Sequence, residues 1–393
     1  KKWLTAEGTT LGADNGVGVA ASLALMKKIH ENEISFKDIN IDLLFTVAEE
    51  AGFFGAYQIE DKMIAGNFLI NLDGERFNSI TIGSAGVQLT NIEVIDNKNA
   101  ENEHEKEIQA VKIKLSGLLG GHSGTEIHLG RGNAIKILVN VLWKLNKRFL
   151  VYLCSIEGGK NLNAIPRESS AMLHVKKTDL PKIREHVKIL NKTINNEYAG
   201  IEDGINISIE KVNDTKNQSF SQEIQQKILN VLYLIPNGVI KMHPEIKDLV
   251  FTSTNLSSIS TRRNRIKIVS SQRSFDESSL MEISEKLVEF FNLAKLKIKY
   301  KYLGIYGIWN PNFDSLLLEY AKKTFKNLFH EKPFIKIWHA GLETGVFKTK
   351  FPDLDLITIG PNMNSCHSPD ERLDIESVEK FWNFLIHLLH QIR

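Results

Sequence analysis

The chain has 393 residues, of which 42% are hydrophobic and 24% are charged, so we expect an ordinary globular protein with a sizeable core. Its 49 basic and 47 acidic residues give a formal net charge of +2, which argues against nucleic acid or a membrane surface as its main partner. No apolar run reaches the ~20 residues of a membrane span, and no signal peptide is visible. The two cysteines lie far apart in the sequence and do not support a disulfide framework, so the expected compartment is the reducing cytoplasm.

Residues 1–83 are predicted to alternate helix and strand. Helical apolar patterns lie at residues 15–29 and 52–60. Runs typical of buried strands lie at residues 41–50 and 67–73. Helices and strands at this spacing predict a mostly parallel sheet with covering helices.

Residues 84–305 change to longer amphipathic helices and paired strands. Helices are predicted at residues 133–148, 179–198, 221–235 and 279–294. Strands are predicted at residues 107–117, 149–159, 169–177, 205–212, 249–260, 264–274 and 295–304. Two rounds of helices on antiparallel strands predict two similar α+β halves, although the sequence shows no close residue-level repeat.

Residues 306–393 return to the style of the first segment. Helices are predicted at residues 312–329 and 374–392, with a strand at 354–360 between them. The simplest architecture is therefore one split α/β domain, built from residues 1–83 and 306–393. Residues 84–305 would form a second, α+β domain inserted into it.

Acidic and histidine side chains follow several strand runs of the split domain. Glu49 and Glu50 come after one apolar run, Asp73 after the next and His367 after the last, while Asp14 follows the short stretch TTLGA. Each position alone is more often a helix cap or a structural residue. Because the carboxyl ends of parallel strands line one crevice, the whole set instead predicts a metal site. Carboxylates and imidazole without a thiolate suit zinc, manganese or cobalt.

Two metal ions about 3.5–4 Å apart would relieve the repulsion among these carboxylates and form a hydrolytic centre. Asp14 is the natural bridge between them, because its glycine-rich loop allows close approach of the backbone. A phosphate-binding loop is the weaker interpretation, since the loop has no lysine and a central aspartate repels phosphate. The adjacent Glu49 and Glu50 point different ways, so one can bind metal while the other acts as general base.

At this point the sequence resembles a known family, the co-catalytic zinc peptidases of the aminoacylase and carboxypeptidase group. The motifs are GTTLGADNGVGVA, FTVAEEAGFFGA, LINLD, GGHSGTEIHLGRGNA, NAIPRES, HAGLETG and IGPNMNSCHSPDERL. They are most similar to the aminoacyl-histidine dipeptidase branch and extend from about residue 3 to the C-terminus. The resemblance implies hydrolysis of Xaa-His dipeptides by water activated on two Zn²⁺ ions, with Mn²⁺ or Co²⁺ as substitutes. An amidohydrolase of N-acyl amino acids is the alternative within the same family.

The resemblance also implies a role for each residue of the metal site. Asp14 would bridge the two metals, Glu50 and His367 would complete one of them, and Asp73 would serve the other. Glu49 would be the general base and later the proton donor to the leaving amine. The split domain would then be the catalytic domain and the inserted domain a lid over a small peptide substrate. Both a homodimer and a monomer, in which the doubled lid replaces a partner, remain open.

On the lid, His122 resembles the family's histidine that polarises the scissile carbonyl, the alternative being an incidental histidine in a glycine-rich turn. Substrate-binding candidates by the same resemblance are Arg273, Asn255, Asn163, His339 and Glu343. Arg273 and Asn255 would hold the terminal carboxylate of the substrate, with a surface salt bridge as the alternative for the arginine. Asn163 could instead shape a turn.

One departure from the family is marked. The family's first metal motif, His-x-Asp, lies well upstream of the Asp14 loop, whereas only thirteen residues precede Asp14 here and none is histidine. The missing histidine would complete the metal held by Asp73. We expect this chain to be a fragment, since every downstream motif is intact. A shortened gene, whose product is a catalytically impaired remnant, is the other interpretation.

Overall fold

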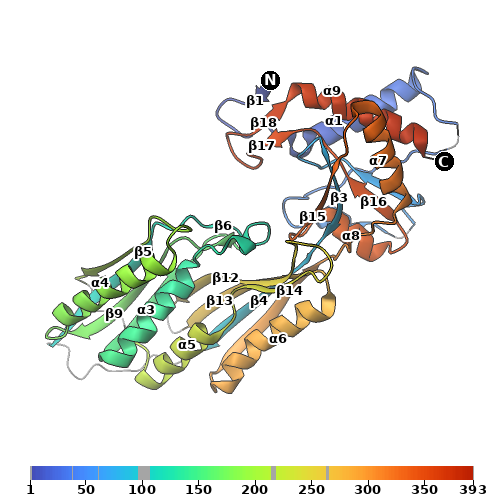
Figure 1. The fold of residues 1–393 in the computed structure, drawn as a ribbon. Coiled ribbons are helices and arrows are strands. Elements are labelled where there is room, and N and C mark those ends of the chain that lie inside the picture. The colour runs from blue at the N-terminus through green and yellow to red at the C-terminus, as the bar shows by residue number, and fades with distance from the viewer. Residues whose placement is uncertain are drawn as a thin grey trace. The chain divides into compact units, whose positions relative to one another are not determined.

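The computed structural model describes residues 2–37, 39–60, 62–95, 107–213, 218–262 and 265–392 (Figure 1). The chain forms two compact units. The first unit consists of Lys1–Ala85 and Tyr306–Arg393, and the second of Gly86–Ile305. Among the described residues, no helix combines the length and the apolar character that a membrane span needs.

A four-stranded sheet forms the centre of the first unit. Its strand order is β15 (Phe334–Trp338), β3 (Ser79–Ser84), β16 (Asp355–Thr358) and β2 (Phe68–Asn71). The outer two pairings are parallel, and the central pairing of β16 with β3 is antiparallel. A separate three-stranded sheet joins β1 (Trp3–Thr5), β18 (Arg372–Asp374) and β17 (Met363–Asn364). The strand β1 near the N-terminus is therefore paired with β18, which directly precedes α9.

Helices in the described part of the first unit pack on this sheet or beside it. They are α1 (Ala13–His30), α2 (Phe54–Gln58), α7 (Leu316–Phe329), α8 (Glu343–Lys350) and α9 (Ile375–Gln391). Helix α9 shows why they form: Phe381, Phe384, Leu385 and Leu388 recur at helical spacing and are all buried in the core that α9 shares with the sheet. The predicted helices of both chain ends, and the strands at β2 and β16, are thus confirmed.

The strand predicted at residues 41–50 is wrong. No described strand pairs with this segment, which is irregular throughout. Ile41 and Leu43 pack partly against the core, whereas Phe45 and Val47 are 48% and 66% exposed. An apolar run becomes a strand only where a neighbour offers a hydrogen-bonding ladder, and the run itself carries no information about that neighbour.

The second unit is built on one nine-stranded sheet. The order along its main path is β10-β5-β9-β7-β12-β13-β4-β14, and β11 pairs beside it with β12. The bounds are β4 (Gly86–Ile95), β5 (Ile108–Ser116), β7 (Val151–Gly158), β9 (Ser169–Lys176), β10 (Asn206–Lys211), β11 (Gly238–Met242), β12 (Val250–Arg262), β13 (Arg265–Ser274) and β14 (Ile298–Tyr306). The pairings from β10 to β4 are antiparallel, which confirms the predicted strands of this segment.

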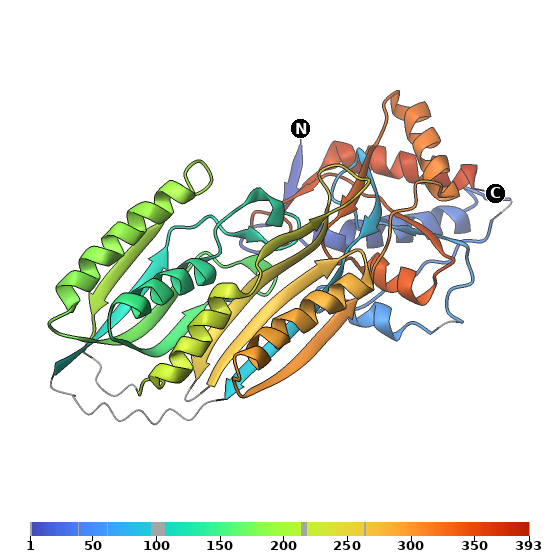
Figure 2. The same ribbon diagram turned by 60° about the horizontal axis from the view of Figure 1, so that its bottom comes forward.

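Helices of the same unit cover this sheet, as Figure 1 and Figure 2 show. They are α3 (Ala134–Arg148), α4 (Leu180–Glu197), α5 (Gln222–Leu234) and α6 (Glu277–Leu293). The helices α3 and α4 belong in sequence to the half with β5, β7, β9 and β10, and α5 and α6 to the half with β12 and β13. The two predicted halves are joined between β7 and β12, where only Ile259 and Ser260 have partners in β7.

Candidate metal and catalytic site

The first unit brings three of the predicted metal ligands together. Asp14 lies in the first turn of α1, Glu50 in the loop before α2, and His367 in the loop between β17 and β18. The Nε2 atom of His367 is 2.8 Å from Asp14 Oδ2 and 2.9 Å from Glu50 Oε1. Their ligand atoms all lie within 4.8 Å of one another, which is the spacing needed to surround one cation.

Two further acids crowd the same place. Asp73 follows β2, and its Oδ1 atom is buried without a hydrogen-bond partner. Burial, and then the charge of Asp14, raise the pKa of Asp73 well above its usual value. Burial and the charges of Glu50 and Glu343 raise the pKa of Glu49 to about 7. The orphaned oxygen and the crowded carboxylates fit a divalent cation, which would satisfy the oxygen and offset the repulsion.

The structure also places two residues at Asp14 that were not predicted. A carboxylate oxygen of Glu75, the sulfur of Cys366 and an oxygen of Asp14 all lie within 4.8 Å of one another. They form a second group of potential ligand atoms. Burial, and then the charges of Glu75 and Asp14, raise the pKa of the Cys366 thiol to about 12. The thiol also packs on the small apolar cluster around Ala13, so it is protonated and partly buried in this structure. The only sequence signals were that these residues lie close to Asp73 and His367.

Glu343 lies near this cluster rather than apart from it. Glu343 begins α8 and lines, with Asp73 and Trp338, a cavity of about 60 Å³. Burial raises the pKa of Glu343, against an opposing hydrogen bond from Thr46. His339 follows β15 and is only 5% exposed. The predicted substrate-binding residue Glu343 thus lines a small cavity that it shares with Asp73 and Glu75.

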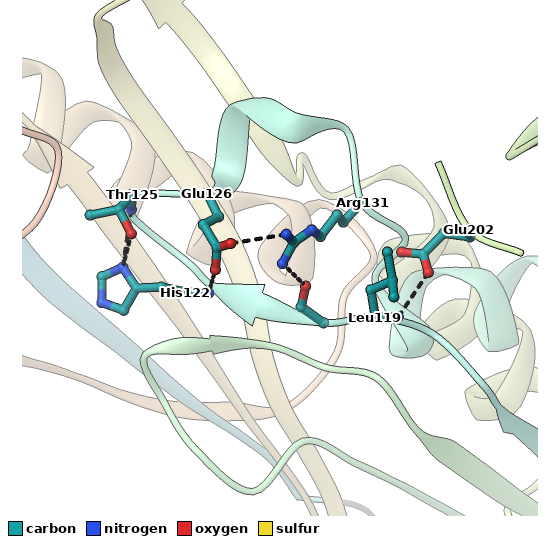
Figure 3. Close-up of polar contacts among 7 residues, drawn as sticks. Leu119, His122, Thr125, Glu126, Arg131 and Glu202 are labelled. Carbon is teal, nitrogen blue, oxygen red and sulfur yellow. Dashed lines mark hydrogen bonds and ion pairs between the residues drawn. The ribbon is translucent and has the colours of Figure 1, made fainter. Parts of the chain in front are cut away.

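In the second unit, His122 is held in one orientation (Figure 3). Its Nδ1 atom accepts hydrogen bonds from the backbone N–H groups of Gly124 and Thr125, at 3.2 and 3.0 Å. Because a backbone N–H can only donate, Nδ1 carries no proton and the neutral ring carries its proton on Nε2. Burial and the charge of Arg273 lower the pKa of His122 to about 4, so the ring is neutral at pH 7.

The loop around His122 is tied by two carboxylates, which Figure 3 also draws. Glu126 accepts from the His122 backbone N–H at 2.7 Å and pairs with Arg131 at 2.9 Å. Glu202, which is 1% exposed, accepts from the backbone N–H groups of Leu119 and Gly132, at 2.8 and 2.9 Å. The two backbone segments that flank the histidine are therefore bonded to one buried side chain.

Of the remaining predicted residues of the second unit, Arg273 and Asn255 are buried, whereas Asn163 is exposed. Arg273 is 2% exposed, so the alternative of a surface salt bridge is wrong. Its Nη2 donates to Ser123 Oγ at 3.4 Å and to Asn163 Oδ1 at 3.2 Å. Asn163 also accepts the Ser123 backbone N–H through its carbonyl oxygen, so it does help to shape this turn. These hydrogen bonds hold the Arg273 guanidinium next to Ser123, the residue that follows His122.

Asn255 is engaged by the fold itself. Its amide nitrogen donates to the carbonyl oxygen of Ala164 and to Ser257 Oγ, both at 3.0 Å. Its oxygen accepts from Asn133 Nδ2 at 3.1 Å, and the side chain is 1% exposed. This network favours a structural role for Asn255 over contact with a substrate carboxylate.

Comparisons with known proteins identify the family of this chain. Residues 7–391 match the model of the family described as peptidase family M20/M25/M40. The cytosol non-specific dipeptidase of Escherichia coli K12 is 34% identical over 392 residues, which cover 100% of this chain and 78% of that protein. The crystal structure of an aminoacylhistidine dipeptidase from Vibrio alginolyticus superposes with a TM-score of 0.85 at 33% identity, covering 100% of this chain and 78% of that one. Aminopeptidase PepT from Bacillus cereus, 13% identical with a TM-score of 0.52 over 99% of this chain and 74% of that one, shares the fold.

Proposed function

This chain belongs to peptidase family M20/M25/M40, and on that premise we propose that it is a metal-dependent dipeptidase of the cytoplasm. The observation that carries the proposal is the convergence of Asp14, Glu50 and His367 within 4.8 Å beside the orphaned Oδ1 of Asp73. The similarity to the cytosol non-specific dipeptidase and to the aminoacylhistidine dipeptidase supports short peptides as the substrate class, with Xaa-His dipeptides among them.

We assign the metal ligands residue by residue. Asp14 would bridge two cations, with Glu50 and His367 on one of them and Asp73 on the other. Zinc is the proposed metal, and manganese or cobalt would substitute, because the set consists of carboxylates and one imidazole. When bound, such cations supply activation of water and polarisation of the peptide carbonyl.

Glu49 is the proposed general base. It lies beside Glu50 in sequence, and burial and then the charge of Glu50 raise its pKa to about 7, which favours uptake of a proton. Its carboxylate would take the proton of the attacking water and later give it to the leaving amine. The positive charge of His367 lowers the pKa of Glu49, whereas the neighbouring carboxylates raise it. Bound cations would lower it in the same way.

His122 is the proposed oxyanion donor, supplied by the second unit acting as a lid. Its proton is on Nε2, so the neutral ring can donate to an oxygen on which negative charge develops. Arg273, which contacts Ser123 next to this histidine, adds positive charge to the same region and keeps the ring neutral. Such a donor stabilises the transition state more than the substrate.

Substitution of His122 by alanine will lower kcat by about 10²–10³-fold, because it removes a preorganised donor to the oxyanion. Metal content will stay at the wild-type value, since His122 is not among the assigned ligands. Turnover and metal content are measured on the same preparation, by dipeptide hydrolysis and by elemental analysis. His128→Ala is the matched control, because His128 is exposed on the same loop. A kcat within twofold of wild type for His122→Ala would remove the residue from the mechanism.

The function itself is tested on a substrate panel. The chain, loaded with zinc or manganese, is assayed on β-alanyl-histidine, on dipeptides with free N-termini, and on N-acyl amino acids. We expect the free dipeptides to be cleaved with the higher kcat/KM and chelation to abolish the activity. Faster cleavage of N-acyl amino acids would favour the amidohydrolase of the same family instead. The product of the complete genomic reading frame is assayed in parallel.

A further inference from the structure

Glu371 is a buried carboxylate whose bonds lead away from its own segment. It precedes β18 and is only 2% exposed. Its Oε2 accepts a hydrogen bond from the backbone N–H of Gly12 at 2.8 Å, and its Oε1 accepts one from the backbone N–H of Asp14 at 3.1 Å. Both oxygens are therefore bonded to the loop that carries the proposed bridging ligand.

Gly12 gives that loop no side-chain cap, and Asn15 Oδ1 accepts a backbone N–H only further along, from Gly18 at 3.0 Å. Gly12 stands at the N-cap of α1 with a left-handed backbone, φ 72°, and has no side chain to bond the first amides. Asp14 has a non-helical backbone, φ −90° and ψ 100°, and its carboxylate faces His367 rather than the amides. Free amides at a helix start need an acceptor and favour a negative charge. Glu371 supplies both, from a position 357 residues away in sequence.

The backbone of Glu371 is in turn bonded to the segment that carries a second proposed ligand, His367. His367 lies four residues before Glu371, and the turn between them is closed by the hydrogen bond from the Glu371 backbone N–H to the carbonyl oxygen of Ser368 at 3.0 Å. Glu371 thus bonds through its side chain to the backbone of Asp14 and through its own backbone to the turn of His367. The Asp14 carboxylate and the His367 ring meet at 2.8 Å where these two segments come together.

We propose that Glu371 is a positioning residue, which holds the Asp14 loop against the His367 turn so that both side chains face one divalent cation. This inference rests on the proposed function, because it takes Asp14 and His367 to be ligands. Residues that orient metal ligands in this way contribute to metal affinity without touching the metal. A buried glutamate with both oxygens bonded to backbone amides is well suited to that task, because it fixes the main chain rather than the side chain of the ligand.

The test is Glu371→Gln, measured as the dissociation constant for zinc by competition with a chromophoric chelator. The two carboxylate oxygens of Glu371 accept from two backbone N–H groups, whereas glutamine has one oxygen and one NH₂ group. One of the two hydrogen bonds and the negative charge are therefore lost in the variant. We expect metal affinity to fall about 10–100-fold, as for other residues that orient metal ligands. The absorption spectrum of the cobalt-loaded protein is expected to change as well, because it reports the ligand geometry. Asp370→Asn is the matched control, since Asp370 is the neighbouring acid and is exposed.

A merely structural cap gives a different result. In that case Glu371→Gln lowers the melting temperature but binds zinc with wild-type affinity and gives the wild-type cobalt spectrum, which overturns the inference. If Glu371→Gln does not fold, the zinc affinity and the cobalt spectrum are measured on Glu371→Asp instead. This variant keeps the charge on a shorter side chain, and the same outcomes apply to it. A wild-type chain that binds no divalent cation would contradict the proposed function itself. Tight binding by the wild type and the variant alike would overturn only the role of Glu371.

Discussion

Substitution of Glu49 by glutamine will lower kcat for dipeptide hydrolysis by about 10²–10⁴-fold, the usual contribution of a general acid–base group. Glutamine keeps the size of the side chain but cannot accept the proton of water. Metal content will stay at the wild-type value, because Glu50 and not Glu49 lies within the ligand group of Asp14 and His367. The measurement is steady-state turnover of the product of the complete reading frame at saturating metal, together with metal stoichiometry per chain.

Two further variants give this experiment its contrast. Glu60→Gln is the control, because Glu60 is an exposed glutamate of the same unit, and we expect wild-type turnover. Glu50→Gln, at the adjacent position, is expected to lower the metal content, and its turnover should fall because metal is lost. Near-normal turnover of Glu49→Gln would refute the general base, and metal loss in that variant would show that the roles of Glu49 and Glu50 are exchanged.

Substitution of Asp14 by asparagine will abolish hydrolysis and lower the metal content of the purified chain. Asp14 takes part in both 4.8 Å groups of potential ligand atoms, and it also lowers the stability of the charged form of Asp73. An amide has one acceptor oxygen and no charge, so it can neither bridge two cations nor neutralise them. Metal stoichiometry by elemental analysis and the melting temperature with and without zinc are measured on the same samples.

The matched control is Asp42→Asn, because Asp42 is an exposed aspartate of the same unit. In wild type and in this control, zinc should raise the melting temperature, since a ligand that binds only the folded state stabilises it. In Asp14→Asn the shift should disappear at the same zinc concentration. Retention of the wild-type number of bound metal ions by Asp14→Asn would exclude Asp14 as the bridge.

Helices were predicted well from the sequence because their signal is local. The apolar residues of α3 and α9 recur at a spacing of three and four, and no distant partner is needed to recognise that pattern. Strands depend on partners. The apolar run at 41–50 has none among the described strands, and the strands β3, β4 and β15 were not predicted from their own residues. Their pairings join segments of the chain that no local pattern connects.

The same difference appears in the site. Asp14, Glu50 and His367 were predicted from runs interpreted as strands that end on one side of a sheet. The structure places none of the three at the end of a strand of the four-stranded sheet, whereas Asp73 does follow one, β2. Glu371 was missed, since an acid four residues after a histidine is unremarkable until its bonds to a loop near the other chain end are seen. Asn255 was assigned to the substrate, yet its amide is used by Asn133 and Ala164, which only the folded chain brings together.

The ligands of the proposed cation come from remote parts of the chain, and Asp14 and His367 are 353 residues apart. A cation bound there acts as a removable cross-link, and the entropy cost of closing a loop grows only slowly with its length. This cross-link joins the two stretches of the first unit, which is discontinuous in sequence. The second unit is one continuous stretch and contains none of the proposed ligands. Metal supply would then set not only the rate of the reaction but also how long the discontinuous unit survives proteolysis, because without the cation this cross-link between its two stretches is lost.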